Sequence, residues 1–488
     1  MERKEKLLAA AAVLFGANSI KAAMFKDEET EKRNYPDEKV NRERYLDTLS
    51  KGIQCKTVSA YDANEVDWNE FKKFHKLLEE SYPLMHKKLQ VKEFGNASLM
   101  FKWEGKNKSL DPIALLAHQD VVPVAEGTEN EWKHDPYSGF NDGEFIWGRG
   151  SLDMKNHLIA VMESVETLLE EGYEPKRTVY VCLGHNEEVA AAADNGAREM
   201  AEYFKSESIH LEAVLDEGGA MLPLTVPGVI DRNLAAVGIA EKGNMNVHVS
   251  VKGKGGHSSQ PPKHTALGKI ANVIRDIERH PFKPEMPDYI MESLIRVGKQ
   301  CSFPVRMITC HIPALKPLIT LVLSEIRGGS ALVRTCQSVT MAKGSLQFNI
   351  LPEEAMITVN FRTMPGVTFE DVESHLRRHV REKDIKVEFF AGQEASAESS
   401  MNSKAFSTIK SICESTMEKT VTVPFLVIGG TDSHNYSIVC ENIYRFMPFL
   451  VEPDVLTTTH GTNERFPIKT ADDAIAFFKR YIRAMTGE

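Results

Sequence analysis

The chain has 488 residues, 42% of them hydrophobic and 26% charged, which is enough for two or three domains and a sizeable core. This composition excludes wholesale disorder and collagen-like repeats. Acidic residues outnumber lysine and arginine by 69 to 59, a net charge of −10, so we expect no nucleic acid among the partners. The seven cysteines are scattered and include no C-x-x-C pair, and they predict neither a disulfide framework nor a thiolate zinc site.

Residues 1–46 are predicted to be a leader or an exposed arm. A charged start precedes a short apolar run at 7–16, which has the outline of a signal peptide without a convincing cleavage site. The run is too short to span a membrane. Two interpretations stay open: a degenerate leader or anchor of a secreted or membrane-anchored protein, or a plain N-terminal helix of a cytoplasmic one. The highly charged residues 26–46 are expected to be exposed.

Residues 47–236 predict the first part of an α/β domain. An amphipathic helical pattern runs from about 65 to 92. Short buried strands are expected at residues 113–117, 179–183 and 213–215, and a helix at residues 158–169 lies between the first two. This alternation is typical of a sheet covered by helices.

Residues 237–395 predict a second, α+β domain inserted into the first. Its strands alternate polar and apolar residues, as half-exposed strands do, and its elements follow a β-α-β-β-α-β-like order. The expected strands are 246–251, 355–361 and 387–390, and the expected helices are 265–279 and 369–381. Residues 280–340 form a long insertion within it. The α/β pattern returns over 396–488, so the first domain is expected to be discontinuous.

Histidines and carboxylates follow the predicted buried strands. The groups are His118 to Asp120, His185 to Glu188 and Asp216 to Glu217, with Asp153 in the turn before the helix at 158–169. Carboxyl ends of strands line the ligand crevice of open α/β sheets, and these side chains suit zinc or a similar divalent metal. Each one alone has a structural explanation, such as Asp153 capping its helix.

The order of these motifs resembles that of a family of zinc-dependent peptidases and amidohydrolases. The family includes carboxypeptidase S, aminoacylase, acetylornithine deacetylase and succinyl-diaminopimelate desuccinylase, and the likeness is strongest to the branch of carboxypeptidase S and N-fatty-acyl-amino acid synthase/hydrolases. It covers about 75–485. The motifs that carry it are residues 118–123, 132–137, 148–155, 184–188, 216–219, 256–259, 349–352, 360–362, 430–433 and 460–464.

The resemblance implies a fold and two metal ions. The expected fold is a discontinuous zinc-peptidase-like catalytic domain, a mixed sheet with helices on both faces, carrying an inserted α+β lid or dimerisation domain. Two zinc ions per chain are expected, with Co²⁺ or Mn²⁺ as possible substitutes. The implied ligands are His118 and Asp216 for one ion, Glu188 and His460 for the other, and Asp153 as the bridge.

The resemblance also implies catalytic roles. Glu187 is the expected general base, which activates water and passes the proton to the leaving nitrogen. Asp120 lies two residues beyond His118, hence on the same strand face, and is expected to orient that histidine. His257 of the inserted domain would stabilise the oxyanion, although a surface loop histidine is the plainer alternative.

Substrate residues follow from the same resemblance. Arg362 and Asn349 are expected to bind substrate, with Gly430 and Thr431 as further candidates, since an arginine fork suits a carboxylate. A structural ion pair is the alternative for Arg362. The implied substrate is a small peptide or an N-acyl amino acid, and condensation of a fatty acid with an amino acid is also allowed. In relatives the inserted domain often forms a homodimer and lends its histidine to the neighbouring subunit.

Two rival hypotheses remain. Where many relatives carry glycines the chain has alanines at 190–193, and Asn186 replaces a frequent aspartate, so a metal-binding homologue with impaired catalysis is one alternative. Retention of Glu187 disfavours it, because a mere binder needs no base. A serine hydrolase using Ser258 is the other, but no G-x-S-x-G elbow surrounds that serine.

Overall fold

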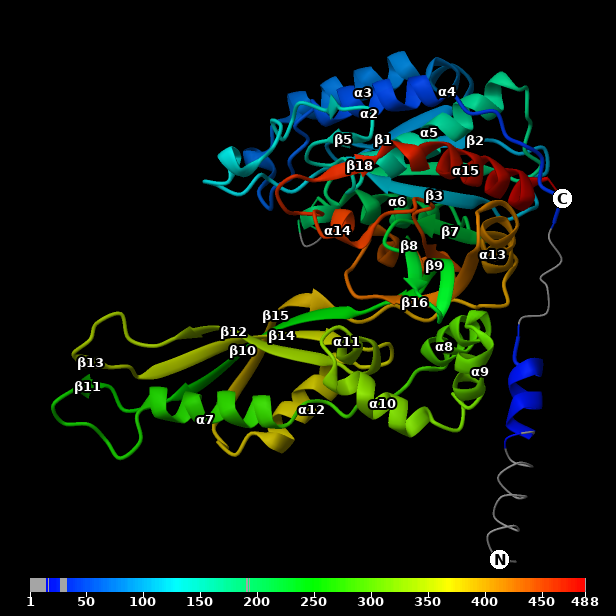
Figure 1. The fold of residues 1–488 in the computed structure, drawn as a ribbon. Helices are drawn as coiled ribbons and strands as arrows, with labels where there is room; N and C mark the ends of the chain where they lie inside the picture. The colour runs from blue at the N-terminus through cyan, green and yellow to red at the C-terminus, as the bar shows by residue number, and fades with distance from the viewer. Residues whose placement is uncertain (1–14, 16, 27–32, 190–191, 193, 488) are drawn as a thin grey trace, which may run out of the picture.

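The computed structural model describes residues 15, 17–26, 33–189, 192 and 194–487 (Figure 1). Apart from residue 15, the apolar run at 7–16 lies outside these residues. Residues 17–24 are helical. None of the helices in the described part of the chain combines the length and the apolar character that a membrane span needs.

A nine-stranded mixed sheet forms the centre of the larger body. Its order is β1-β2-β6-β3-β7-β17-β9-β16, with β8 paired to β9. The strands are β1 (Gln90–Phe94), β2 (Ser98–Trp103), β3 (Ile113–His118), β6 (Val179–Gly184), β7 (Ala213–Asp216), β8 (Ala220–Val226), β9 (Ile230–Glu241), β16 (Thr420–Val427) and β17 (Ile443–Arg445). Strands β6, β3, β7 and β17 are parallel, so their carboxyl ends meet at one edge of the sheet.

Helices cover both faces of this sheet, as predicted. Alternate residues of β3 point to opposite sides: Leu115 packs in the core that holds α5 (Lys155–Glu170), and Leu116 packs in the core that holds α6 (Gly196–Ser206). Both faces of β3 are therefore buried, which explains its unbroken apolar sequence. On the α5 side lie also α2 (Arg42–Ile53), α4 (Pro83–Lys88), α13 (Lys404–Thr416) and α15 (Ala471–Thr486).

Two predicted segments differ from the structure. The helical pattern at 65–92 divides into α3 (Trp68–Ser81) and α4, because Pro83 can begin a helix but cannot continue one, and residues 90–92 belong to β1. The exposed segment, expected to reach residue 46, ends earlier, because α2 begins at Arg42 and Tyr45 within it is fully buried.

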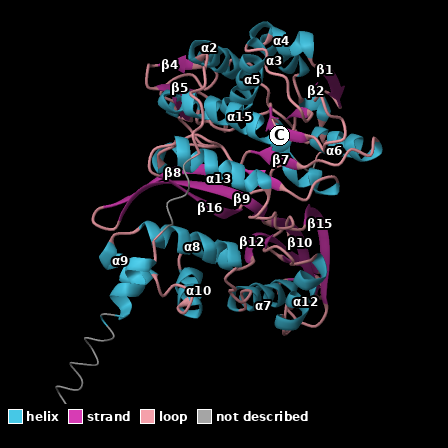
Figure 2. Ribbon diagram, turned by 90° about the vertical axis from the view of Figure 1, so that its right-hand side faces the viewer, coloured by secondary structure: helices cyan, strands magenta, loops and turns pink. Residues whose placement is uncertain are grey.

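The inserted domain is a four-stranded antiparallel sheet, β12-β14-β10-β15, with α7 (Ala266–Arg279) and α12 (Phe369–His379) on one face (Figure 2). Its strands are β10 (Gly243–Lys252), β12 (Cys336–Lys343), β14 (Glu354–Thr363) and β15 (Ile385–Gln393). The predicted alternation in β10 is confirmed: Met245, Val247 and Val249 are buried against the helices, while Asn244 and Asn246 lie on the other face. Only Lys242 separates β9 from β10, so one nearly continuous strand enters both sheets.

The long insertion at 280–340 is helical. It forms α8 (Asp288–Gln300), α9 (Phe303–Thr309), α10 (Lys316–Glu325) and α11 (Gly329–Val333). Helix α8 packs on β16, where Arg296 donates to the carbonyl of Thr422 at 3.2 Å. The insertion therefore lies against the edge of the central sheet.

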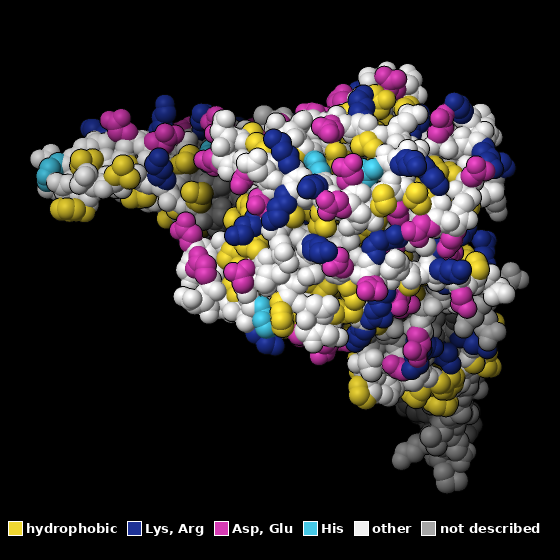
Figure 3. Space-filling model, turned by 90° about the horizontal axis from the view of Figure 1, so that it is seen from above, with side chains coloured by type: hydrophobic (Ala, Val, Ile, Leu, Met, Phe, Trp, Pro, Cys, Tyr) yellow, Lys and Arg dark blue, Asp and Glu magenta, His cyan; other side chains and the backbone are white. Residues whose placement is uncertain are grey.

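The inserted domain ends in a projecting tip. There β11 (Gly256–His257) pairs with β13 (Ile350–Leu351), at the end of the inserted domain that is turned away from the central sheet (Figure 1). Figure 3 shows hydrophobic side chains gathered on this projection. Leu346 and Phe348, in the loop before β13, are 90% and 98% exposed.

The domain boundaries at 46/47, 236/237 and 395/396 stay predictions. In the structure, residue 46 lies inside α2, residue 236 lies inside β9, and residue 395 lies between β15 and α13.

Candidate metal centre and active site

One carboxylate, Asp153, lies between two histidines. His118 ends β3, and its Nε2 is 3.1 Å from Asp153 Oδ1. His460, which follows α14 (Pro453–Leu456), places its Nε2 2.9 Å from Asp153 Oδ2. The same His460 nitrogen is 3.2 Å from Glu188 Oε1. Asp153 makes no cap hydrogen bond to α5, so the capping explanation is wrong.

Further carboxylates crowd this centre. Glu187 and Glu188 follow β6, and their ligand atoms come within 4.8 Å of the His118 ring nitrogen. Burial and the charges of neighbouring acids raise the pKa of Glu187 and of Glu217 well above the usual range. Burial opposes ionisation of Asp153 as well, but hydrogen bonds from both histidines outweigh it and lower the pKa of Asp153.

The donor set fits divalent metal ions. Hydrogen bonds to Asp153 and Glu188 raise the pKa of His460 to about 10, so without a metal the imidazole is the cation that these carboxylates hold. A bound cation replaces those protons and supplies the positive charge that the buried acids need. Imidazole nitrogens and carboxylate oxygens are ligands that zinc accepts.

Asp120 contacts the ring nitrogen of His118 that is turned away from Asp153. His118 Nδ1 lies 3.0 Å from the Asp120 carbonyl and 3.3 Å from its Oδ1, which leaves Nε2 to face Asp153. The Asp120 carboxylate also accepts hydrogen bonds from the backbone N–H groups of Glu187 and Glu188, at 3.1 and 3.2 Å. Asp120 therefore orients one histidine and the loop after β6 together.

Glu464 holds the backbone at Asp153 in place, a role that the sequence did not reveal. Its carboxylate accepts the backbone N–H groups of Leu152 and Asp153 at 2.8 and 3.2 Å, and Arg149 forms a buried ion pair with it. Arg149 also donates to the carbonyl of Gly461, next to His460. The motifs at 148–155 and 460–464 thus interlock around the metal centre.

The structure places Asp216 and Glu217 differently from the expectation. Asp216 is buried, and its two oxygens accept the backbone N–H groups of Glu217 and Ser433 at 2.9 and 2.8 Å. Glu217, by contrast, lines the cavity that contains Asp153, Glu187 and His460. The side chain that faces the centre from this strand end is therefore Glu217.

This cavity has a volume of about 970 Å³ and lies between the two domains. Besides the carboxylates it is lined by Arg362, Asn244 and Asn246 from the inserted sheet, and by Gly430 and Thr431 from the loop after β16. Arg362 is half-buried, burial lowers its pKa, and its guanidinium has no carboxylate partner among the described residues. A structural ion pair, the alternative for Arg362, is therefore not formed.

A buried network holds the loop at 430–431. Glu241, at the end of β9, accepts hydrogen bonds from the backbone N–H and the hydroxyl of Thr431, at 3.1 and 3.2 Å. The other partners of Glu241 are the buried Arg445 at 3.1 Å and His434 at 3.1 Å. The loop is thereby fixed to the point where the chain enters the inserted domain.

Two expected residues are not brought to the cavity of their own chain. His257 and Asn349 are exposed at the projecting tip and do not line it. His257 Nδ1 contacts the Ser259 hydroxyl at 2.8 Å, and the Asn349 carbonyl accepts the N–H of Ser258. Of the alanines at 190–193, only residue 192 belongs to the described residues.

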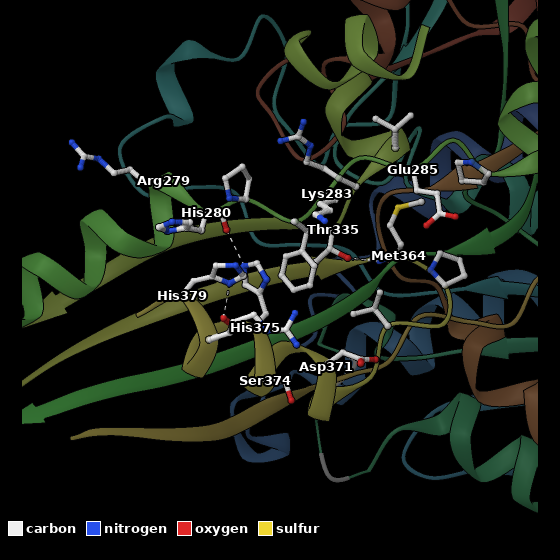
Figure 4. A pocket seen from close by; sticks show the side chains of 18 of the residues that line it. Arg279, His280, Lys283, Glu285, Thr335, Met364, Asp371, Ser374, His375 and His379 are labelled. Carbon is white, nitrogen blue, oxygen red and sulfur yellow. Dashed lines mark hydrogen bonds between the residues drawn. The ribbon is translucent and has the colours of Figure 1, made fainter. Parts of the chain in front are cut away.

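A second cavity, of about 1070 Å³, lies elsewhere in the inserted domain and contains none of the motif residues (Figure 4). Three histidines lie together on one side of it: His375 donates to the carbonyl of His280 at 2.8 Å, and His379 donates to that of His375 at 3.0 Å. Their ligand atoms do not form a metal-binding group within the described residues.

We expect Glu217→Gln to weaken zinc binding more than Asp216→Asn. Glu217 faces the centre, so its substitution removes a proposed ligand. Asp216 only holds the backbone beside the centre, and loss of such a supporting contact lowers metal affinity by roughly 10- to 100-fold. Elemental analysis after dialysis against a graded chelator measures both variants. A larger loss from Asp216→Asn would return the ligand role to Asp216.

The chain is similar to known proteins in sequence and in fold. The model of peptidase family M20/M25/M40 matches residues 114–484. A probable carboxypeptidase S-like 2 of Dictyostelium discoideum is 35% identical, over 89% of this chain and 84% of that protein. The N-fatty-acyl-amino acid synthase/hydrolase PM20D1.1 of Danio rerio is 31% identical, over 90% and 85%. The crystal structure of the M20 family metallo-carboxypeptidase Sso-CP2 from Sulfolobus solfataricus has a similar fold, with a TM-score of 0.65 at 17% identity and coverage of 90% and 98%. The chain therefore belongs to peptidase family M20/M25/M40 and is a hydrolase.

Proposed function

We propose that the protein is a di-zinc hydrolase of an amide bond next to a free carboxylate, either in a peptide with a C-terminal residue to release or in an N-acyl amino acid. The observation that carries the proposal is the placement of Asp153, with one oxygen turned to each of two histidines. A carboxylate so placed is suited to bridge two ions.

The proposed ligands surround that bridge. His118 and Glu217 hold one ion, Glu188 and His460 hold the other, and Asp153 joins them, which gives each ion three protein ligands and an open position. Bound zinc, or Co²⁺ or Mn²⁺ in its place, polarises the scissile carbonyl and lowers the pKa of water.

Glu187 is the proposed general base. It lines the cavity, and its Oε2 is 3.9 Å from the ring nitrogen of His118. A carboxylate that lies in the cavity beside the proposed ligands can take a proton from water and release it to the leaving nitrogen. A metal-binding protein without catalysis has no need of such a group.

Arg362 is the proposed anchor of the substrate carboxylate, because it faces the cavity and has no acidic partner among the described residues. The amides of Asn244 and Asn246 lie beside it on the same sheet face and are held by Asn360. Apolar side chains of Leu222, Leu234, Phe425 and Phe449 also line the cavity. They suit the acyl chain or an apolar peptide side chain on the other side of the bond.

His257 is proposed to act in the cavity of a partner subunit. It lies outside its own chain's cavity, at a tip that exposes Leu346 and Phe348. A two-fold dimer through the inserted domains brings each tip to the other protomer by symmetry. His257 then stabilises the oxyanion there, and Asn349 accompanies it.

Glu187→Gln should lower kcat by at least ~10²-fold, the usual contribution of a general base, while zinc content stays unchanged. Turnover of N-acyl amino acids and dipeptides is measured beside elemental analysis, with the exposed Glu202→Gln on α6 as control. Activity within threefold of the unmodified enzyme would rule out Glu187 as the base.

Arg362→Ala should lower kcat/KM for the free acid by roughly ten- to a hundredfold, the contribution of a hydrogen bond to a charged group. The amidated substrate should lose much less, because it already lacks the charge. The exposed Arg275→Ala on α7 serves as control. Equal losses on acid and amide would mean that Arg362 does not bind the carboxylate.

Mixing Glu187→Gln with His257→Ala should restore activity that neither variant has alone. In a mixed dimer one cavity combines an intact Glu187 with the partner's intact His257, so random assembly should recover about a quarter of the normal activity. Activity is followed after the two variants are unfolded and refolded together. No recovery, in a mixture shown to contain mixed dimers, would place His257 in its own chain's reaction or outside the reaction.

A further inference from the structure

Two helical segments far apart in the sequence lie together at one end of the molecule. The helix at 17–24 runs beside α9, and α10 lies on the same end of the molecule in both views (Figures 1 and 2). Asn18 donates to the carbonyl of Met307 at 3.2 Å, and His311 contacts both Asn18 and Lys21, at 2.7 and 3.2 Å. The N-terminal helix is therefore packed on the insertion at 280–340.

Helix α10 is apolar on its outer side as well as its inner one, where Ile319 and Leu323 pack against the core. Its hydroxyl residues Thr320 and Ser324 are buried and bond to carbonyls of their own helix. Leu318, Leu321 and Val322 are 57%, 57% and 50% exposed. A helix facing water normally presents its charged and polar residues outward.

The N-terminal helix also presents apolar side chains outward. Its polar contacts, Asn18 and Lys21 with His311, are turned to the protein, and Ala22 is fully buried. Ile20 and Met24 are 64% and 77% exposed. Ile308 on α9 is 67% exposed and Ile326 after α10 is 51% exposed, so both segments present apolar side chains to solvent at this end of the molecule.

The charge and the preceding sequence indicate what covers this surface. Residues 17–24 and 303–327 together contain four lysines and arginines but one glutamate, in a protein whose net charge is −10. Nine consecutive apolar residues, 7–15, lead directly into the N-terminal helix. Apolar side chains framed by positive charge match the acyl boundary and headgroups of an anionic lipid surface.

We propose that the helix at 17–24, α9 and α10 form a membrane-docking surface, by which the protein lies on an anionic lipid bilayer. Leu318, Leu321, Val322, Ile308, Ile20 and Met24 enter the boundary of the acyl chains. Arg306, Lys316 and Arg327 lie on the same segments and are proposed to meet lipid phosphates and carboxylates. The inference is independent of the proposed reaction.

The test is flotation of the full-length protein with phosphatidylcholine vesicles, with and without about 30% phosphatidylserine. We expect binding to the anionic vesicles, weaker binding to neutral ones, and loss of the difference at high salt. The double substitution Leu321→Glu with Val322→Glu should lower the partition coefficient at least ~10-fold, and Ile20→Glu should lower it as well. The matched control is Val91→Glu, which alters a 41% exposed side chain on β1 of the central sheet.

The side chains to be changed are exposed, so hydrolysis of a soluble substrate and the thermal midpoint should not change. If the double variant is misfolded, Ile308→Glu on α9 provides the same test. Absence of vesicle binding by the unmodified protein, or equal binding by the patch variants, would overturn the proposal. A shift of the patch variants to a smaller assembly, with vesicle binding unchanged, would identify the surface as a contact between copies.

Discussion

The crowding of half-buried carboxylates beside the carboxyl ends of β3, β6 and β7 is the constraint on which the catalytic domain depends. Asp153, Glu187, Glu188 and Glu217 lie together near His118 and His460, and burial, with repulsion from the neighbouring acids, raises the pKa of the three glutamates. Unpaired buried charge is costly, so the fold must supply positive charge at this point. Protonated histidines do so without metal, and divalent ions do so with it.

A second set of buried acids fixes the first in place. Asp120, Glu464, Asp216 and Glu241 each accept backbone N–H groups from the loops that carry the site. A carboxylate that accepts several fixed donors in a buried setting has little freedom to move, and neither do the loops that it holds. This arrangement explains why the motifs at 118–123, 216–219 and 460–464 contain acids in addition to the proposed metal ligands.

The inserted domain is coupled to the same framework. Glu241 lies at the end of β9, one residue before the chain continues into β10, and it also holds the loop at 430–431. The face of the inserted sheet opposite its helices bears Arg362, Asn244 and Asn246 into the cavity between the domains. Any movement of this sheet therefore changes the shape of the cavity, while the tip with His257 lies outside it.

The sequence alone determined those elements whose burial produces a recognisable pattern of apolar residues along the chain. Strands buried on both faces, such as β3 and β6, are continuous apolar runs, and β10 alternates because one of its faces is polar. The motif order likewise identified His118, Asp153, Glu187, Glu188 and His460, which the structure brings together.

The tertiary structure decided which way particular side chains face. Whether Asp216 or Glu217 faces the cavity depends on how the chain turns after β7, and adjacent residues give no signal of it. Composition likewise shows that α10 is apolar, but only the tertiary structure shows that its two hydroxyls face inward while Leu318 and Leu321 face outward. Sequence periodicity records which side chains share a face, and the surrounding fold determines what that face meets.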